Sequence, residues 1–118
     1  MANIERHRVV IIGAGGGALC MGIKLKEAGI HDFVMLEKAS GVGGTWYHNT
    51  YPGAECDVQS HLYSFSFEPK LDWSRPFAGQ KEILEYFNHC ADKYGLRPHL
   101  RLKTTVDSAK WDEARGTW

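Results

Sequence analysis

The chain has 118 residues, which is enough for one domain and too few for two. Its 43% hydrophobic and 24% charged residues are ordinary for a globular protein and exclude a disordered or fibrous chain. Fourteen Lys and Arg residues balance fourteen Asp and Glu residues. Proteins that bind nucleic acid or anionic membranes usually carry a basic excess, so we expect neither kind of partner.

The cysteines, Cys20, Cys56 and Cys90, are widely spaced, and none belongs to a C-x-x-C pair. Their odd number favours free thiols in a reducing compartment. No run approaches the ~20 apolar residues that a membrane helix needs, and residues 1–8 lack the apolar stretch of a signal peptide. These features predict a cytoplasmic protein.

Residues 8–37 have the pattern of a β-α-β unit. A short apolar run over 8–12 is typical of a strand buried on both faces of a parallel sheet. Apolar and small residues then recur at helical spacing from Ala18 to Ala28, and Gly29 is placed to end that helix. Residues 33–36 form a second buried-strand candidate, which ends at Glu37. This order predicts an α/β, Rossmann-like three-layer fold with a parallel sheet.

The rest of the chain alternates between loop and regular structure. Residues 39–79 are rich in glycine, proline and aromatic residues, which indicates a long functional loop. Helical spacing returns over 80–94, and alternation over 100–106 predicts a third strand. Residues 108–118 have the pattern of a hairpin cut short. The fold is therefore expected to be incomplete, with sheet edges through which the chain could oligomerise.

A glycine motif connects the first strand to the helix. Gly13 to Ala18 follow the pattern G-x-G-x-x-A, in which Gly13 permits a tight turn and Gly15 lets a pyrophosphate approach the backbone. Ala18 is small enough for the helix to pack on the strand. Glu37 follows at about the ~20-residue offset of an acid that binds a ribose 2′-hydroxyl and repels a 2′-phosphate. The motif predicts FAD or NAD, and not NADP, in this site.

Several further motifs carry a family resemblance. They are GVGGTW at 41–46, YPG at 51–53, CDV at 56–58 and SHLYSFSF at 60–67. Together they make the chain resemble class B flavoprotein monooxygenases, most closely the Baeyer–Villiger type, over residues 8–118. The resemblance implies an enzyme that binds FAD and uses NADPH and O2 to insert oxygen into a ketone. An enzyme that oxygenates N or S heteroatoms and a non-catalytic dinucleotide-binding module are the alternatives.

The resemblance also implies roles for individual residues. Asp57 corresponds to an acid near the flavin ring, with a supporting catalytic role. The residues expected to bind the cofactor are Gly13, Gly15, Gly17, Glu37, Lys38, Gly44, Thr45, Trp46, Tyr47, His48, Asp57, Tyr63 and Val106. Packing in the core is the alternative role for Trp46 and Tyr63, and capping of a turn is the alternative for Asp57.

The chain departs from the family pattern in three positions and in length. Gly16 replaces a bulkier residue, His48 a frequent tryptophan, and Glu55 a basic or small residue. Family members are several times longer and carry a second Rossmann domain for NADPH. We therefore expect this chain to be the N-terminal part of an FAD-binding domain that is inactive by itself. The six histidines lack the spacing of metal ligands, so no metal site is expected.

Overall fold

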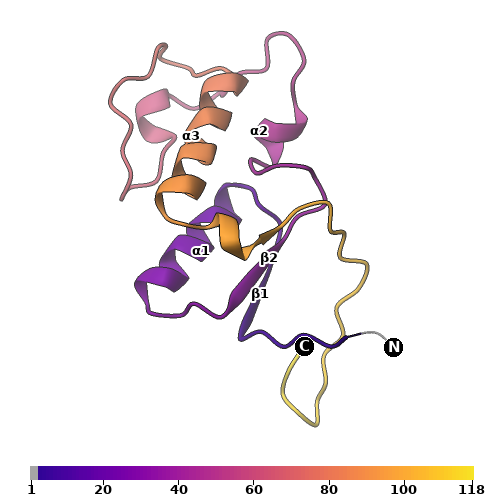
Figure 1. Ribbon diagram of the computed structural model, residues 1–118. Helices are drawn as coiled ribbons and strands as arrows, with labels where there is room; N and C mark the ends of the chain where they lie inside the picture. The colour runs from indigo at the N-terminus through magenta and orange to yellow at the C-terminus, as the bar shows by residue number, and fades with distance from the viewer. Residues whose placement is uncertain (1–2) are drawn as a thin grey trace.

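The computed structural model describes residues 3–118 and has a three-stranded parallel sheet (Figure 1). The strands are β1 (Val9–Ile12), β2 (Phe33–Leu36) and β3 (Leu100–Arg101), which lie in the order β1-β2-β3. Helix α1 (Gly16–Glu27) connects β1 to β2, and helix α3 (Gln80–Lys93) precedes β3. The short helix α2 (Thr45–His48) and two 3-10 turns, η1 (Ser60–Leu62) and η2 (Arg97–His99), complete the fold. The predicted Rossmann-like α/β class is confirmed.

The β-α-β unit follows the apolar pattern of the sequence. Val9 pairs with Phe33 and Ile12 with Leu36 in the parallel β1–β2 ladder. Helix α1 ends where Gly29 adopts a φ of +78°, a left-handed conformation that glycine adopts without steric cost. The glycine loop is thereby held at the carboxyl end of β1, beside the carboxyl end of β2.

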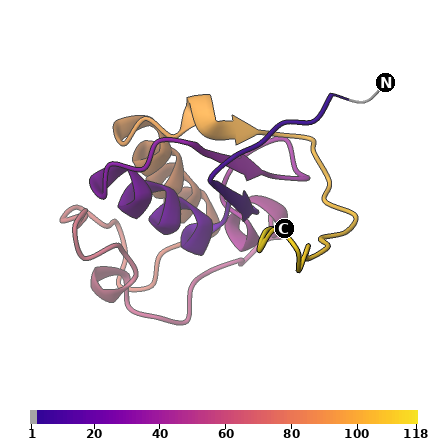
Figure 2. The same ribbon diagram turned by 90° about the horizontal axis from the view of Figure 1, so that it is seen from below.

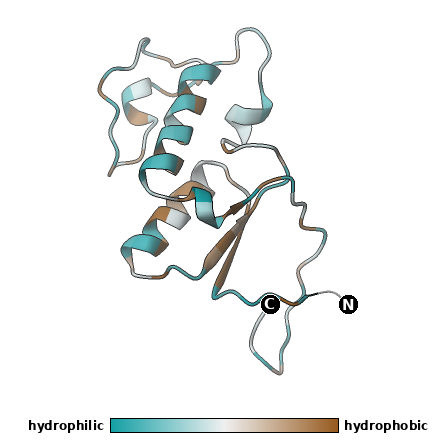
Figure 3. Ribbon diagram, in the orientation of Figure 1, coloured by the Kyte–Doolittle hydropathy of each residue, from teal (hydrophilic) through white to brown (hydrophobic). Residues whose placement is uncertain are grey.

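The core lies between the sheet, α1 and α3. Leu19 and Ile23 of α1 are fully buried, as are Met35 of β2 and Ile83 of α3. Gly22 lets α1 pack close to the sheet, because a Cβ there would lie 3.3 Å from the sulfur of Met35. Figure 3 shows the same division, with apolar β1 and β2 and an α3 that is mostly hydrophilic on its outer side.

Strand β1 is buried on one face only, which corrects the prediction of burial on both. Ile11 faces α1 and is 9% exposed, whereas Val10 and Ile12 are 51% and 64% exposed. Both long helices lie on the same side of the sheet (Figure 2). A groove of about 730 Å³ runs along the other side of β1, between Val10 and Ile12 and the segment 108–118. The three-layer arrangement is thus reduced to one helical layer in the described residues.

The C-terminal quarter contains less regular structure than the sequence predicts. The strand expected over 100–106 ends at Arg101, because Lys103 has a φ of +53° and turns the chain across the end of β2. The N–H of Lys103 then donates to the carbonyl of Ala39. The hairpin expected over 108–118 is reduced to one antiparallel bridge, between Asp112 and Thr117.

The long loop over 39–79 is ordered by contacts with the helices. It contains α2 and η1, two short elements that the sequence pattern did not indicate. A bridge between Glu55 and Gly79 joins the middle of the loop to the start of α3. Phe65 and Phe67 stack on each other and pack against the core. The loop is therefore folded against α3.

Candidate nucleotide-binding site

The glycine loop and the loop before α2 form a junction built from backbone atoms. The N–H of Gly13 donates to the carbonyl of Leu36, at 2.8 Å, and the N–H of Gly43 donates to the carbonyl of Ala14, at 2.9 Å. A Cβ on Gly44 would lie 3.0 Å from the Cα of Gly15. Only glycine fits at Gly44, because its φ of +56° is also left-handed.

The same contact gives Gly15 a second function. A Cβ on Gly15 would point at the Cα of Gly44, 3.6 Å away, so the missing side chain serves the packing of two loops. Gly17 is different, since a Cβ there would meet nothing within 4 Å. The first turn of α1 carries no acidic side chain, and its N–H groups have no partners within the helix. Such a helix end attracts an anion.

A cavity of about 230 Å³ opens beside this loop, at the carboxyl ends of β1 and β2. Glu37 lies in it and is 6% exposed, and its Oε2 atom has no hydrogen-bond partner among residues 3–118. A buried carboxylate oxygen without a partner is costly unless a ligand supplies a donor. The residues that line the cavity are Ile12, Gly13, Leu36, Glu37, Lys38, Thr104, Thr105 and Val106.

The backbone of Glu37 is fixed from both sides. Its N–H donates to the carbonyl of Arg101, at 3.0 Å, and its carbonyl accepts the N–H of Thr104, at 2.9 Å. Thr104 and Thr105 were not among the predicted site residues, and no motif pointed to them. They reach the cavity because Lys103 turns the chain across the end of β2. Val106, which was predicted from the resemblance, lines the same cavity.

Helix α2 carries the next group of predicted residues, and they divide by exposure. Thr45 and His48 are exposed, and Tyr47 is half-buried. Trp46 is 9% exposed and belongs to the core. Its indole N–H donates to the hydroxyl of Tyr63, at 3.0 Å, and the two rings meet edge to face. The open side of α2 therefore presents Thr45 and His48, while Trp46 anchors the helix.

Asp57 follows a segment that is tied to α3. The N–H of Cys56 donates to the carbonyl of Ala78, and the N–H of Gln80 donates to the carbonyl of Ala54. Asp57 itself is exposed, and the structure shows no side-chain hydrogen bond for it. Its carboxylate is free to meet a partner, whereas the neighbouring Cys56 thiol is buried.

Two of the departures from the family pattern are compensated by neighbouring residues. A Cβ on Gly16 would lie 3.2 Å from the ring of Phe87, so the ring of this buried phenylalanine occupies the space beside Gly16. The carboxylate of Glu55 pairs with Arg75, at 2.6 Å. Glu55 is thus balanced by a cation in the same loop.

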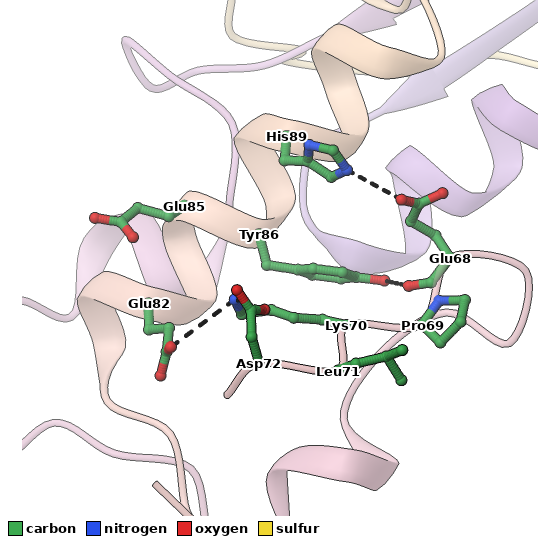
Figure 4. A pocket seen from close by; sticks show the side chains of 9 residues that line it. All are labelled: Glu68, Pro69, Lys70, Leu71, Asp72, Glu82, Glu85, Tyr86 and His89. Carbon is green, nitrogen blue, oxygen red and sulfur yellow. Dashed lines mark hydrogen bonds and ion pairs between the residues drawn. The ribbon is translucent and has the colours of Figure 1, made fainter. Parts of the chain in front are cut away.

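A second cavity, of about 410 Å³, lies between segment 68–72 and α3 and contains none of the predicted site residues (Figure 4). The Glu68 carboxylate accepts hydrogen bonds from Lys93, at 2.7 Å, from Tyr94, at 2.8 Å, and contacts His89, at 3.0 Å. The hydrogen bond from Lys93, followed by those from His89 and Tyr94, lowers the pKa of Glu68 to about 2. Burial raises the pKa of Tyr86, which lies on the same side of α3. These contacts tie the loop to α3.

Within residues 3–118, no three His, Cys, Asp or Glu side chains gather where they could share a metal ion. The helices in that range are also too short or too polar to cross a membrane.

A sequence-family profile described as an NAD(P)-binding Rossmann-like domain matches residues 11–78, which include the end of β1, the glycine loop, Glu37 and α2. The chain belongs to this family. The match covers the residues of the backbone junction and the first part of the Glu37 cavity lining, from Ile12 to Lys38, whereas residues 104–106 of that lining lie outside it. Membership of the Rossmann-like family is therefore consistent with the position of the candidate site.

Relatives of this Rossmann-like domain are flavoprotein monooxygenases. A Baeyer–Villiger monooxygenase of Streptomyces coelicolor is 52% identical over 114 residues, or 97% of this chain and 22% of that protein. A steroid monooxygenase bound to NADP superposes with a TM-score of 0.87, at 45% identity over 92% of this chain and 21% of the other. The OTEMO complex with FAD and NADP gives a TM-score of 0.86, at 34% identity over 95% and 22%.

These comparisons confirm the resemblance to Baeyer–Villiger monooxygenases that the sequence motifs indicated. The chain spans about a fifth of the length of the relatives that it matches.

Proposed function

We propose that this Rossmann-like domain binds FAD and belongs to a monooxygenase that uses NADPH and O2 to insert oxygen into ketones. The adenosine half of FAD would occupy the Glu37 cavity, and its pyrophosphate would lie at the first turn of α1. The flavin ring would extend toward α2. The single observation that carries the proposal is the buried, unpartnered Oε2 atom of Glu37 beside the glycine loop.

The residues of the cavity fit a nucleotide. The Glu37 carboxylate can accept hydrogen bonds from a ribose, which would remove the cost of its unpaired oxygen. Gly13, Gly15 and Gly17 leave the end of α1 accessible to the phosphates, which the helix dipole favours. Lys38 and Val106 also line the cavity. A carboxylate at this position disfavours a 2′-phosphate, so FAD fits the cavity and NADP does not.

The flavin supplies the oxygen-transfer chemistry when it is bound, and the protein supplies position and charge. We assign Thr45, Tyr47 and His48 to the wall beside the ring, with Trp46 and Tyr63 behind them. Asp57 is exposed and free of side-chain partners, so it can orient a cationic group near the ring.

Ketone oxygenation is favoured over the alternatives because two relatives that are 52% and 49% identical to this chain are named Baeyer–Villiger monooxygenases. This name describes the conversion of ketones into esters or lactones. The NADP in the steroid monooxygenase structure supports NADPH as the reductant. We assign the NADPH site and the ketone pocket to parts of the protein beyond this domain, since neither follows from the groove along β1 or from the two cavities described above.

The proposal is tested by titrating the 118-residue chain with FAD and following flavin fluorescence and heat of binding. We expect saturable binding that Glu37→Gln weakens by about 1–2 kcal/mol, because the amide loses a charged acceptor. Glu85→Gln is the matched control, since Glu85 is an exposed glutamate on α3 and lines the other cavity. Its affinity for FAD should equal that of the unmodified chain.

Two results would contradict the proposal. One is a folded chain that does not bind FAD at high micromolar concentration. The other is an equal loss of affinity in Glu37→Gln and Glu85→Gln, which would place the ligand outside the Glu37 cavity. Circular dichroism of each variant shows whether it is folded before the titration.

A further inference from the structure

Helix α2 has little structure of its own to hold it in place. It has four residues, and its N-cap, Gly44, provides no side-chain hydrogen bond. A single helical turn is unstable in isolation, so its position depends on tertiary contacts. Under the proposed function, α2 forms the wall beside the flavin ring. Whatever fixes α2 therefore also fixes the shape of that wall.

Two side-chain hydrogen bonds converge on Trp46, in the middle of α2. The side-chain amide of Gln80 donates to the Trp46 carbonyl, at 2.6 Å. The indole N–H of Trp46 donates to the hydroxyl of Tyr63, at 3.0 Å. One bond holds the backbone of the helix, and the other holds its buried ring. Because they act at opposite ends of one residue, they restrict rotation of α2 about its axis.

Gln80 connects three segments of the chain. It is the first residue of α3, and its backbone N–H donates to the carbonyl of Ala54. Its side chain crosses to α2, 34 residues earlier in the sequence. Gln80 thus fixes the position of α2 relative to the start of α3 and to the segment that leads to Asp57. Gln80 was not among the residues predicted from sequence.

The partner of the indole is itself held by α3. Tyr63 begins the segment that ends at Glu68, and the Tyr86 hydroxyl joins two backbone groups of that segment. It accepts the N–H of Phe65, at 2.9 Å, and donates to the carbonyl of Glu68, at 2.7 Å. Figure 4 shows the Tyr86 ring reaching from α3 to the Glu68 backbone. Both bonds to Trp46 therefore lead to the same helix, α3.

We infer that Gln80 is a positioning residue for the flavin-ring half of the site. It acts through Trp46, which it holds together with Tyr63, and it does not touch the nucleotide. The inference rests on the proposed function, since it assumes that α2 lies beside the ring. It predicts that Gln80 influences the binding of FAD and leaves the binding of ADP unchanged.

The test compares two ligands that share the adenosine and pyrophosphate groups. FAD and ADP are titrated calorimetrically into the unmodified chain and into Gln80→Met and Gln80→Glu. Both variants keep the length of the side chain and remove the donor to Trp46. We expect FAD affinity to fall about five- to tenfold, the size of one hydrogen bond. ADP affinity should change less than about twofold.

Gln59→Met is the matched control, because Gln59 is exposed and the structure shows no hydrogen bond from its side chain. This variant should bind both ligands like the unmodified chain. Urea unfolding accompanies each titration. An unchanged ratio of FAD to ADP affinity in both Gln80 variants would overturn the inference. So would an equal loss of both ligands, or loss of folding in both variants, since each indicates a purely structural role.

The outcomes also separate this inference from the proposed function. An unmodified chain that binds neither FAD nor ADP would refute both. An unmodified chain that binds the two ligands equally would leave the nucleotide site intact and refute only the role of Gln80. Glu37→Gln provides the opposite pattern, because it should weaken FAD and ADP by the same factor.

Discussion

The two halves of the candidate site are built by different kinds of contact. The nucleotide half consists of backbone hydrogen bonds and close backbone packing, between Gly13 and Leu36, Ala14 and Gly43, and Gly15 and Gly44. The ring half depends on side chains of α3 that reach across the loop. Backbone contacts tolerate most side-chain substitutions and fail only where a Cβ intrudes. Side-chain hydrogen bonds can be removed one at a time by substitution, so the geometry of the ring half is easier to change.

The largest effect should come from Gly44→Ala, which breaks the backbone junction. We expect a loss of about 2–3 kcal/mol of unfolding free energy, because the new Cβ meets backbone and the residue keeps a left-handed φ. Gly53→Ala is the control, since Gly53 has a φ of +85° and nothing within 4 Å of a Cβ. It should lose about 1 kcal/mol in urea unfolding. Equal losses would show that the close packing of the two loops is unimportant.

The next effect concerns the hydrogen bonds that Glu68 makes with Lys93 and Tyr94. Its pKa in the folded chain, about 2, lies below the value of 4.5 that it would have in the unfolded chain. The stabilisation is therefore fully present above about pH 5 and is lost as the pH falls toward 2. Glu68→Gln should cost about 1–2 kcal/mol at pH 7 and progressively less as the pH falls.

Urea unfolding of both proteins between pH 7 and pH 3 measures this difference. The comparison removes the contribution of other carboxyl groups, which titrate in both proteins. A difference that stays constant across this range would mean that Glu68 does not act through its charge.

The smallest effect distinguishes two glycines in the first turn of α1. Gly17→Ala should stabilise the ligand-free chain by about 0.5–1 kcal/mol, because its Cβ meets open space and alanine favours a helix. Gly16→Ala should gain less or lose stability, since its Cβ lies 3.2 Å from the Phe87 ring. Adding Phe87→Leu to Gly16→Ala should restore part of the stabilisation that Gly17→Ala shows. Identical unfolding midpoints for the two alanine variants would show that the Phe87 ring moves aside without loss of stability.

The sequence predicted the structure around the glycine loop better than the structure around α2, for physical reasons. The β-α-β unit is local, and its apolar runs, glycine motif and Glu37 each have a fixed relation to the fold. Burial of Ile12 was predicted wrongly, because an apolar run does not reveal whether a second layer covers it. The third strand was predicted too long, because nothing in the alternation over 100–106 signals the left-handed turn at Lys103.

The side-chain hydrogen bonds of Gln80 and Glu68 had no such signal in the sequence. Gln80 stands at the start of a predictable helix, yet no periodicity indicates that its amide reaches Trp46. Glu68 lies in a segment that resembles an ordinary loop, and its partners lie 21 to 26 residues away. The burial of Trp46 and its bond to Tyr63 agree with the core-packing alternative for both residues. That alternative does not remove them from the site, since they set the position of α2.

The register of the sheet implies an order of folding. The β1–β2 ladder joins Val9 to Phe33, whereas the β2–β3 ladder joins Met35 to Leu100. Closing the longer loop costs about 1 kcal/mol more chain entropy, so β3 is expected to dock after the first two strands have paired. The glycine loop can therefore take shape while the chain is still being synthesised, before α3 emerges. The cavity around Glu37 would follow only later, because residues 104–106, which line it, come after α3 in the chain.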